Sequence, residues 1–154
     1  MLPSALTAFL AAPLQRVSGI PLHRYLQQTR AETVYDVSLT VEINGHTLAR
    51  TSGKNLLWSF DQMLAHHTVT GCGMNTGDLI GSGTISGPRP GEAGCLLEAT
   101  KGGKEPVALV EGIERRWLED GDEVVIRGHC GEGDSRVGWG DCRGRILPAV
   151  DMGL

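Results

Sequence analysis

Residues 77–100 read GDLIGSGTISGPRPGEAGCLLEAT, two short alternating runs separated by a loop rich in glycine and proline. In the first run, 79–87, hydroxyl residues alternate with apolar residues or glycine, and successive side chains of a strand point to opposite faces. The second run, 95–100, alternates in the same way and carries Glu98. The stretch therefore predicts two neighbouring strands, with a row of hydroxyls that includes Thr84 on one face.

The polar face of this predicted hairpin has two interpretations. Half-buried antiparallel sheets commonly expose one polar face, so the hydroxyls and Glu98 would simply face water. Alternatively the face is a ledge for a ligand, where Thr84 donates a hydrogen bond to a polar substrate and Glu98 orients or charges a partner group. Glycines at alternate positions allow another backbone or a ligand to approach closely. The periodicity is compatible with both interpretations.

The clearest strand lies at residues 35–43, where apolar and aromatic residues alternate with polar ones. This alternation predicts a half-buried strand. Asn44-Gly45 follows, and both residues tolerate the positive φ that a type I′ hairpin turn requires. The return strand, 46–50, is expected at an edge of the sheet.

One main helix is expected at residues 56–70, capped by Asn55 and ended by Gly71. Its apolar stripe ends with His67, which should then point toward the sheet. A catalytic base at His67 is conceivable, with Glu98 as its orienting carboxylate. The simpler interpretation is a hydrogen-bonded core histidine.

The remainder of the chain predicts short strands and turns. Residues 1–33 are expected to connect into the sheet, with an amphipathic turn or short helix at 4–11. The acidic turn at 119–122 is expected to be hydrated, because a hard cation needs several converging oxygens. Trp139 is expected to pack. Further strands are expected at 106–110, 117–118, 124–130, 137–140 and 146–149, with a turn at 101–104.

The composition favours one domain of short elements. The chain has 154 residues with 22 glycines and 7 prolines, together well above the average share of about 12%. Its net charge is -4, and no basic stripe is interleaved with aromatics, so a nucleic-acid partner is not expected. No apolar run approaches the roughly 20 residues of a membrane span, and the apolar opening lacks a basic leader. We therefore expect no membrane segment, no signal peptide and a cytoplasmic location.

The four cysteines are expected to be free thiols. They show no CxxC spacing, and a reducing cytosol is the simplest explanation. Zinc binding is the rival explanation, but structural zinc sites usually draw ligands from tight local pairs. Only His66-His67 and His129-Cys130 are adjacent here, so no zinc site is expected. The cysteines are Cys72, Cys95, Cys130 and Cys142.

Residues 34–149 resemble the carboxyl-terminal part of the fumarylacetoacetase, or fumarylacetoacetate hydrolase, family. The resemblance rests on GDLIGSGTISGP, CLLEAT and WLEDGDEVVIRGHCGEGDSRVGWGDCRGRILPA, and extends back through NLLWSFDQMLAHHTVTGC and, more weakly, VYDVSLTVEI. The wider superfamily tends to show proline after Gly-Thr, whereas Ile85 follows Thr84 here. The resemblance implies a mostly-β fold with one main helix, a mixed β-roll or sandwich that is incomplete in this chain. Residues 34–154 would be the carboxyl-terminal part of the catalytic domain.

Enzymes of this family hydrolyse the carbon-carbon bond of a β-diketone acid, 4-fumarylacetoacetate, to fumarate and acetoacetate in the breakdown of tyrosine and phenylalanine. The resemblance implies a histidine that activates water, a glutamate that orients it, and a divalent metal, Mg²⁺ or Ca²⁺, that grips the diketone. It also implies basic groups for the developing carbanion. By motif position, Glu98 matches the orienting glutamate and Thr84 the threonine that contacts the substrate. A homodimer is implied as well.

The other groups of that active site have no matching positions here. The histidine, the metal ligands and the family's lysine would precede Met1, so Lys54 is expected to be only a solvated residue. The family's His-His pair lies on a packing helix, which favours a structural role for His67. The isolated chain is thus expected to supply part of an active site and to lack hydrolase activity. The alternative is a non-catalytic β-rich scaffold or oligomerisation fragment.

Overall fold

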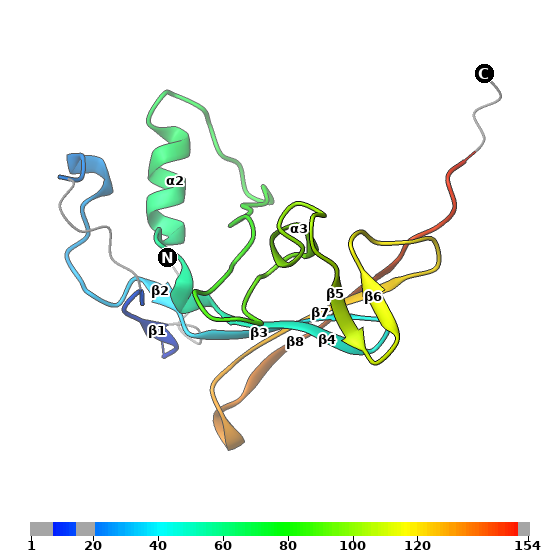
Figure 1. Ribbon diagram of the computed structural model, residues 1–154. Coiled ribbons are helices and arrows are strands. Elements are labelled where there is room, and N and C mark those ends of the chain that lie inside the picture. The colour runs from blue at the N-terminus through cyan, green and yellow to red at the C-terminus, as the bar shows by residue number, and fades with distance from the viewer. Residues whose placement is uncertain (1–7, 15–20, 151–154) are drawn as a thin grey trace.

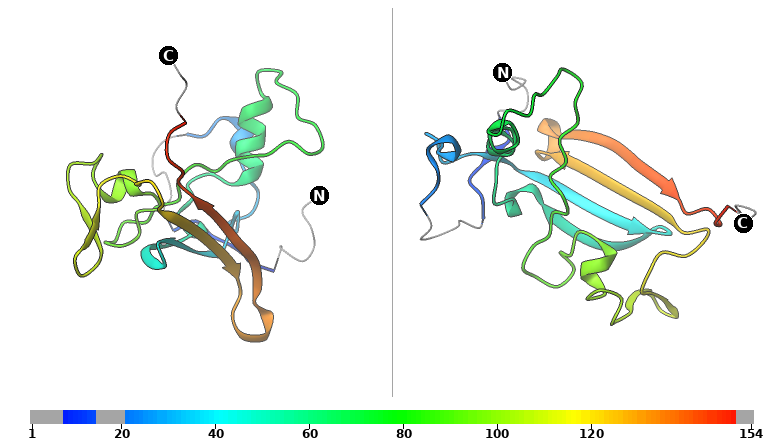
Figure 2. Two further views of the ribbon diagram at one scale, coloured as in Figure 1. Left: turned by 90° about the vertical axis from the view of Figure 1, so that its right-hand side faces the viewer. Right: turned by 90° about the horizontal axis from the view of Figure 1, so that it is seen from above.

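A twisted, antiparallel sheet of four strands is the centre of the fold (Figure 1). The computed structural model describes residues 8–14 and 21–150. The two α-helices of the described residues stand on one side of this sheet, which we call its inner face, and the other side is its outer face (Figure 1). Seen from above, the strands lie side by side along the length of the molecule (Figure 2). In spatial order they are β4 (His46–Ser52), β3 (Val37–Ile43), β7 (Glu123–Cys130) and β8 (Val137–Arg145).

Short elements surround this sheet. β1 (Leu10–Ala11) pairs with β2 (Val34–Tyr35), and β5 (Val107–Val110) pairs with β6 (Ile113–Arg115). The α-helices are α2 (Phe60–Thr68) and α3 (Leu96–Ala99). Single 3-10 turns are η1 (Arg24–Leu26), η2 (Gly53–Asn55) and η3 (Gly133–Ser135). The prediction of a mostly-β fold with one main helix is confirmed.

The β3–β4 hairpin follows from its sequence. Val37, Val41 and Ile43 are buried, whereas the polar residues between them are half-buried or exposed. Asn44 and Gly45 have φ of 51° and 78°, the positive values that the predicted turn requires. β4 lies at the edge of the sheet, as predicted, and is longer than expected.

Helix α2 begins later than predicted because Ser59, and not Asn55, caps it. The Ser59 hydroxyl accepts a hydrogen bond from the Gln62 N–H at 3.1 Å, and the Gln62 side chain accepts one from the Ser59 N–H at 3.0 Å. This reciprocal capping box satisfies two backbone donors at the helix start. Asn55 instead belongs to η2. At the other end, Gly71 has a φ of 89° and its N–H bonds the Thr68 carbonyl at 2.9 Å.

Several predicted strands have different bounds. β5 and β7 lie close to the expected positions. The strand predicted at 117–118 is absent, and β5 pairs instead with β6, at 113–115. β8 is one long strand that ends at Arg145, so the prediction of a separate strand at 146–149 is wrong. Its glycines are accommodated by an irregularity in the β7–β8 pairing, where Gly140 has a φ of 76°.

The connecting segment also differs from expectation. Residues 4–7 of the predicted helix lie outside the described residues, and Leu10–Ala11 form strand β1. The predicted turn at 101–104 is present, with positive φ at its first three residues.

The hydrophobic core is small and lies mostly within the four-stranded sheet. Its buried apolar residues, among those described, are Val34, Val37, Val41, Ile43, Ala49, Val125 and Cys130. Large apolar side chains of the inner face remain exposed, among them Ile126 at 42% and Trp139 at 55%. Much of the inner face is therefore not closed over.

A buried carboxylate, Asp122, stabilises the turn of the β3–β4 hairpin. Asp122 is 3% exposed and accepts hydrogen bonds from Arg115, from the Asn44 amide at 2.7 Å and from the Glu119 N–H at 2.8 Å. Glu123 N–H in turn donates to the Asn44 side-chain oxygen at 2.9 Å. The acidic turn was expected to be hydrated, and for Asp122 this prediction is wrong, because Arg115 and Asn44 take the place of water.

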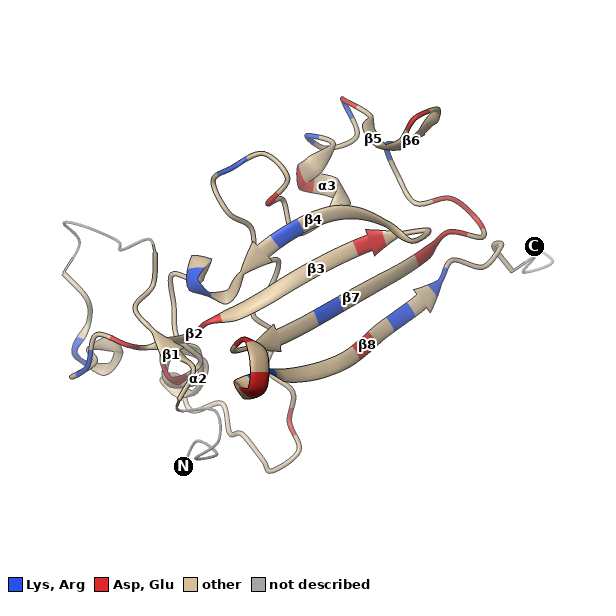
Figure 3. Cartoon of the chain, turned by 90° about the horizontal axis from the view of Figure 1, so that it is seen from below, with Lys and Arg blue, Asp and Glu red and all other residues tan. Residues whose placement is uncertain are grey.

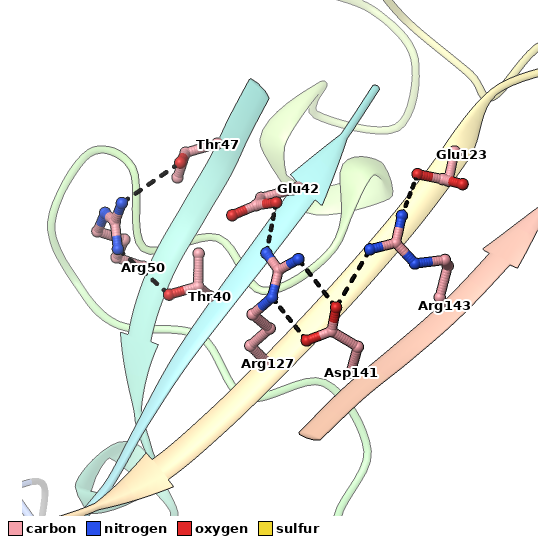
Figure 4. A network of polar contacts seen from close by, with 8 residues as sticks. All are labelled: Thr40, Glu42, Thr47, Arg50, Glu123, Arg127, Asp141 and Arg143. Atoms are coloured by element: carbon pink, nitrogen blue, oxygen red, sulfur yellow. Dashed lines mark hydrogen bonds and ion pairs between the residues drawn. The ribbon is translucent and has the colours of Figure 1, made fainter. Parts of the chain in front are cut away.

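The outer face carries a row of alternating charges (Figure 3). Arg127 on β7 binds Glu42 on β3 at 2.6 Å and Asp141 on β8 at 2.7 Å. Arg143 binds Asp141 at 3.1 Å and Glu123 at 2.5 Å. Hydrogen bonds from Arg127 first, and then from Arg143, lower the pKa of Asp141. We call these five residues the ionic ladder (Figure 4).

Candidate functional site

A cavity of about 520 Å³ opens between the inner face of the sheet and the segment 82–85. Strand β3 forms its floor through Val37, Leu39 and Val41. Ser82, Gly83, Thr84, Ile85, Gly94 and Cys95 line another side, and the remaining wall comes from Tyr35, Thr51, Gly53, Leu56, Phe60, Ile126 and Trp139. The cavity is therefore mainly apolar, with a few hydroxyl groups. That combination is common in small-molecule sites.

The prediction of a strand at 79–87, the first of the two in this region, is wrong. The segment is irregular and crosses over the inner face of the sheet without pairing to a described strand (Figure 1). Gly83 has a φ of 72°, outside the range of a strand. Leu79 is 98% exposed. The alternation predicted a strand wrongly here, because Gly81 and Gly83 occupy two of the positions beside the hydroxyls, and glycine tolerates many backbone conformations.

The second predicted strand, 95–100, is also wrong. Residues Leu96–Ala99 form one helical turn, closed by hydrogen bonds from the Ala99 N–H to the Cys95 carbonyl at 3.1 Å and from the Thr100 N–H to the Leu96 carbonyl at 2.9 Å. Leucine, glutamate and alanine are good helix formers. A segment this short shows no periodicity that distinguishes a helical turn from a strand.

Thr84 and Glu98 are connected through Ser86. Thr84 lines the cavity, whereas Glu98 lies on α3 and is not part of the cavity wall. The Ser86 hydroxyl donates a hydrogen bond to the Glu98 carboxylate and accepts one from the Gly94 N–H at 2.9 Å. The ligand ledge expected on two neighbouring strands is therefore replaced by a loop and a helical turn joined by one serine. Ser86 was evident in the sequence only as one member of the hydroxyl row.

The approach of these two segments depends on Gly94. A Cβ at Gly94 would collide with the Ile85 backbone carbonyl and lie 3.0 Å from the Thr84 methyl group. Glycine at this position therefore allows the loop to reach α3 closely. Both Thr84 and Glu98 are exposed, so a ligand or another segment can reach them.

Tyr35 contributes a polar group that the sequence analysis did not single out as functional. Its side chain lines the cavity, and its hydroxyl is buried without a hydrogen-bond partner among the described residues. Desolvation by burial, followed by the negative charge of Asp61, raises the pKa of Tyr35. A buried hydroxyl with no partner is uncommon and calls for a ligand or another donor or acceptor. No sequence pattern indicated this, since tyrosine also fits the apolar side of a strand.

The histidines of α2 lie away from Glu98. His67 is exposed, and its Nε2 lies 3.2 Å from the Cys72 Sγ, so the prediction that it points toward the sheet is wrong. The Nδ1 of His66 lies 3.3 Å from the Tyr25 hydroxyl. Neither histidine bonds Glu98 within the described residues. Any imidazole that Glu98 orients would thus have to come from elsewhere.

The described residues do not form a metal site. Within 8–14 and 21–150, no group of three or more His, Cys, Asp or Glu side chains is placed to hold a metal ion. Around the cavity the oxygens are hydroxyls, whereas Mg²⁺ and Ca²⁺ are usually held by converging carboxylates. The divalent metal that the resemblance implies does not fit these side chains alone. The cysteines are unpaired, as predicted, and burial raises the pKa of Cys130.

A sequence profile described as "Fumarylacetoacetate (FAA) hydrolase C-terminal" matches residues 17–146. The chain belongs to the fumarylacetoacetate hydrolase family. The matched region contains Thr84, Ser86 and Glu98, and hence every residue of the connection described above. No helix among the described residues is long and apolar enough to cross a membrane.

Relatives within the fumarylacetoacetate hydrolase family are longer than this chain. It is 47% identical to a fumarylacetoacetase of Emericella nidulans, over 100% of the chain and 37% of that relative. It is 50% identical to the fumarylacetoacetase of Aspergillus fumigatus, over 99% of the chain and 36% of that relative. It is 41% identical to the fumarylacetoacetase of Homo sapiens, over 75% of the chain and 29% of that relative. The chain therefore spans about a third of the length of these relatives.

Proposed function

We propose that the chain supplies the carboxyl-terminal part of the active site of a hydrolase that cleaves a carbon-carbon bond in a β-diketone acid. The substrate would be 4-fumarylacetoacetate, and the products fumarate and acetoacetate in tyrosine and phenylalanine breakdown. The observation that carries this proposal is the Ser86–Glu98 hydrogen bond beside the cavity that Thr84 lines. It holds an exposed carboxylate where another segment can reach it.

In this proposal Glu98 is a positioning residue. Its carboxylate accepts a hydrogen bond from an imidazole of another segment and holds that ring in the tautomer that can take a proton from water. Ser86 fixes the carboxylate oxygen that it bonds. Thr84 donates its hydroxyl hydrogen bond to an oxygen of the substrate.

The overall reaction adds one water across one carbon-carbon bond. The water oxygen bonds the attacked carbonyl carbon, the bond to the neighbouring carbon breaks, and the electron pair leaves as an enolate that takes a proton. Hydroxyls such as that of Thr84 hold the substrate, but they do not neutralise the developing negative charge. Donors or cations placed at the enolate oxygen are needed for that.

We propose that these cations come from outside the chain. None of the described side chains that line the cavity is cationic, whereas the substrate is an acid whose burial without a positive partner is costly. The histidine, the basic groups and the carboxylates for Mg²⁺ or Ca²⁺ would come from the part of the longer relatives that the chain does not match. The complete assembly would be cytoplasmic and contain two copies, and the isolated chain would be inactive.

The second candidate function is a non-catalytic β-rich scaffold or oligomerisation fragment. The observation that favours it is the long edge strand β8, whose nine residues are all exposed. An exposed edge presents unpaired backbone groups to a partner. This function needs neither a metal nor a substrate.

A hybrid protein separates the two functions. Residues of the Emericella nidulans relative that precede its matched region are joined to this chain, and loss of substrate absorbance is followed with and without Mg²⁺ or Ca²⁺. We expect no turnover by the 154-residue chain alone and turnover by the hybrid. A folded hybrid without activity would favour the scaffold, and activity of the chain alone would contradict the proposed division of the active site.

A further inference from the structure

The two edges of the four-stranded sheet differ. At the β4 edge, the Arg50 N–H bonds the Gly91 carbonyl at 2.9 Å, so a loop covers part of it. At the other edge, β8 pairs with β7 alone among the described residues, and all nine of its residues are exposed. The outer row of β8 backbone groups is therefore available to another strand.

The charges of β8 suit a particular partner. The ionic ladder alternates in sign from Glu42 through Arg127 to Asp141, and it ends at β8 with Asp141 and Arg143 side by side (Figure 4). Charged edge strands usually oppose edge-to-edge pairing. Here the two charges are opposite in sign and two residues apart, so a strand with the same sequence running the other way can match them.

We propose that β8 pairs antiparallel with β8 of a second copy, about a twofold axis at Cys142. Asp141 then lies opposite Arg143 of the second copy, and Arg143 opposite Asp141 of the second copy. The row Arg127–Asp141 of one copy continues into Arg143 of the other, so the alternation of charge crosses the axis unbroken. Such a self-complementary contact is the usual geometry of a symmetric dimer.

Neighbouring registers fit less well. Directly opposite residues of an antiparallel pair point to the same face, so the axis must pass through a residue and not between two. An axis at Asp141 would bring two carboxylates face to face, and one at Arg143 would do the same with two guanidinium groups. Like charges directly opposite each other destabilise a sheet.

The irregularity at Gly140 limits the contact. The β7–β8 register shifts between Arg127 and His129, and Gly140 has a φ of 76°. A bulge bends an edge and hinders its pairing. The regular part of the edge is therefore 141–145, which contains the axis and both charges.

Cys142 reports this contact directly. Its thiol is exposed and its residue pairs with Ile126, which places it on the inner face. Opposite Cα atoms of antiparallel strands are about 4.5 to 5.5 Å apart, within the range of about 4.4 to 6.8 Å that a disulfide spans. Two Cys142 thiols facing each other across the axis can therefore be joined by a mild oxidant.

This inference rests on the proposal that two copies assemble, but not on any catalytic step. The experiment treats the 154-residue chain with diamide, which takes up two electrons and two protons as it joins two thiols. Products are examined by non-reducing electrophoresis, and assembly without oxidant by sedimentation. We expect a reducible dimer that Cys142→Ser abolishes and that Cys72→Ser, which removes the other exposed thiol, leaves intact.

Charge reversal tests the register. Arg143→Glu sets four carboxylates around the axis and is expected to weaken the dimer at least tenfold, whereas Arg30→Glu, an exposed arginine outside the sheet, should leave it unchanged. Circular dichroism checks that both variants keep their β signal. An Arg143→Glu dimer of unchanged affinity would overturn the pairing.

The remaining outcomes separate the inference from the proposals before it. A dimer in sedimentation without the Cys142 link places the contact elsewhere and overturns this interface, while the two-copy proposal stands. A monomeric 154-residue chain overturns this interface, and a monomeric hybrid overturns the two-copy proposal as well. In the hybrid protein, a Cys142 that neither links nor reacts with a thiol reagent would mean that the added segment covers β8, which also overturns the inference. Hydrolase activity enters none of these measurements.

Discussion

Replacing Asp122 with asparagine is predicted to destabilise the fold by about 3 kcal/mol. The carboxylate is 3% exposed and accepts two hydrogen bonds from Arg115 at 2.9 Å, besides those from Asn44 and the Glu119 N–H. Removing one partner of a buried ion pair typically costs about 3 to 5 kcal/mol. Arg115 keeps a contact with Glu119 at 3.4 Å and is 17% exposed, which places the effect at the low end.

Thermal unfolding followed by circular dichroism measures this change. For a chain of this size, about 3 kcal/mol corresponds to a fall in Tm of roughly 6 to 12 °C. Asp120→Asn is the matched control, because it changes an exposed carboxylate in the same turn, and it should change stability by less than about 0.5 kcal/mol. Equal melting of the two variants would refute the structural role given to Asp122.

The same residue predicts a pH dependence. Hydrogen bonds from Arg115 first, aided by the Glu119 N–H and Asn44, lower the pKa of Asp122 in the folded chain. In the unfolded chain an aspartate has a pKa of about 3.9. The ionised carboxylate therefore stabilises the fold fully above that value, and this contribution is lost as the pH falls toward the lower, folded pKa. The stability difference between the native chain and Asp122→Asn should shrink below about pH 4.

Two further predictions concern the segments around the cavity. Ser86→Ala removes the hydrogen bond that fixes Glu98 and should lower kcat of the hybrid several-fold, with little further loss when Glu98→Gln is already present. Additive losses in the double variant would separate the two residues. Gly94→Ala forces the Ile85 backbone away and should raise KM in steady-state kinetics, whereas Gly73→Ala, where a Cβ meets open space, should not. An unchanged KM for the first variant would show that the close approach is not needed.

The parts of the fold that the sequence predicted are those decided by neighbouring residues. The hairpin of β3 and β4 follows from alternation and from Asn44-Gly45, whose backbone preferences are local. The start of α2 could also have been predicted from local sequence, since Ser59 and Gln62 have the spacing of a capping box. The predicted helix nevertheless began after Asn55, because asparagine by itself is an equally good N-cap residue.

The burial of Asp122 could not be predicted in this way. It results from contact with Asn44, which is 78 residues away in the sequence, and nothing in an acidic turn indicates that distant partner. Hydration is the ordinary state of a carboxylate at a turn. The approach of Arg115 and Asn44 is a property of the tertiary structure.

The sequence predicted two candidate site residues, but not the conformation of the segments that carry them. The motif resemblance indicated Thr84 and Glu98, whereas alternation placed them on two strands that the structure does not contain. Glycine-rich chain tolerates many backbone conformations, so alternate glycines are weak evidence for a strand. Ser86 links the loop to α3 because both segments fold over the same face of the sheet, which no local pattern predicts.

The most direct test of the proposed active site is the turnover of fumarylacetoacetate by the hybrid protein carrying Glu98→Gln. Glutamine keeps the size of the side chain and can still accept a hydrogen bond from Ser86, but it lacks the charge that orients an imidazole. We predict a fall in kcat of at least about 100-fold, the scale of general acid-base catalysis. Glu111→Gln, at the exposed turn between β5 and β6, should leave kcat unchanged. A Glu98→Gln hybrid that is folded and within about twofold of the parent would contradict the account, since a misplaced general base costs far more.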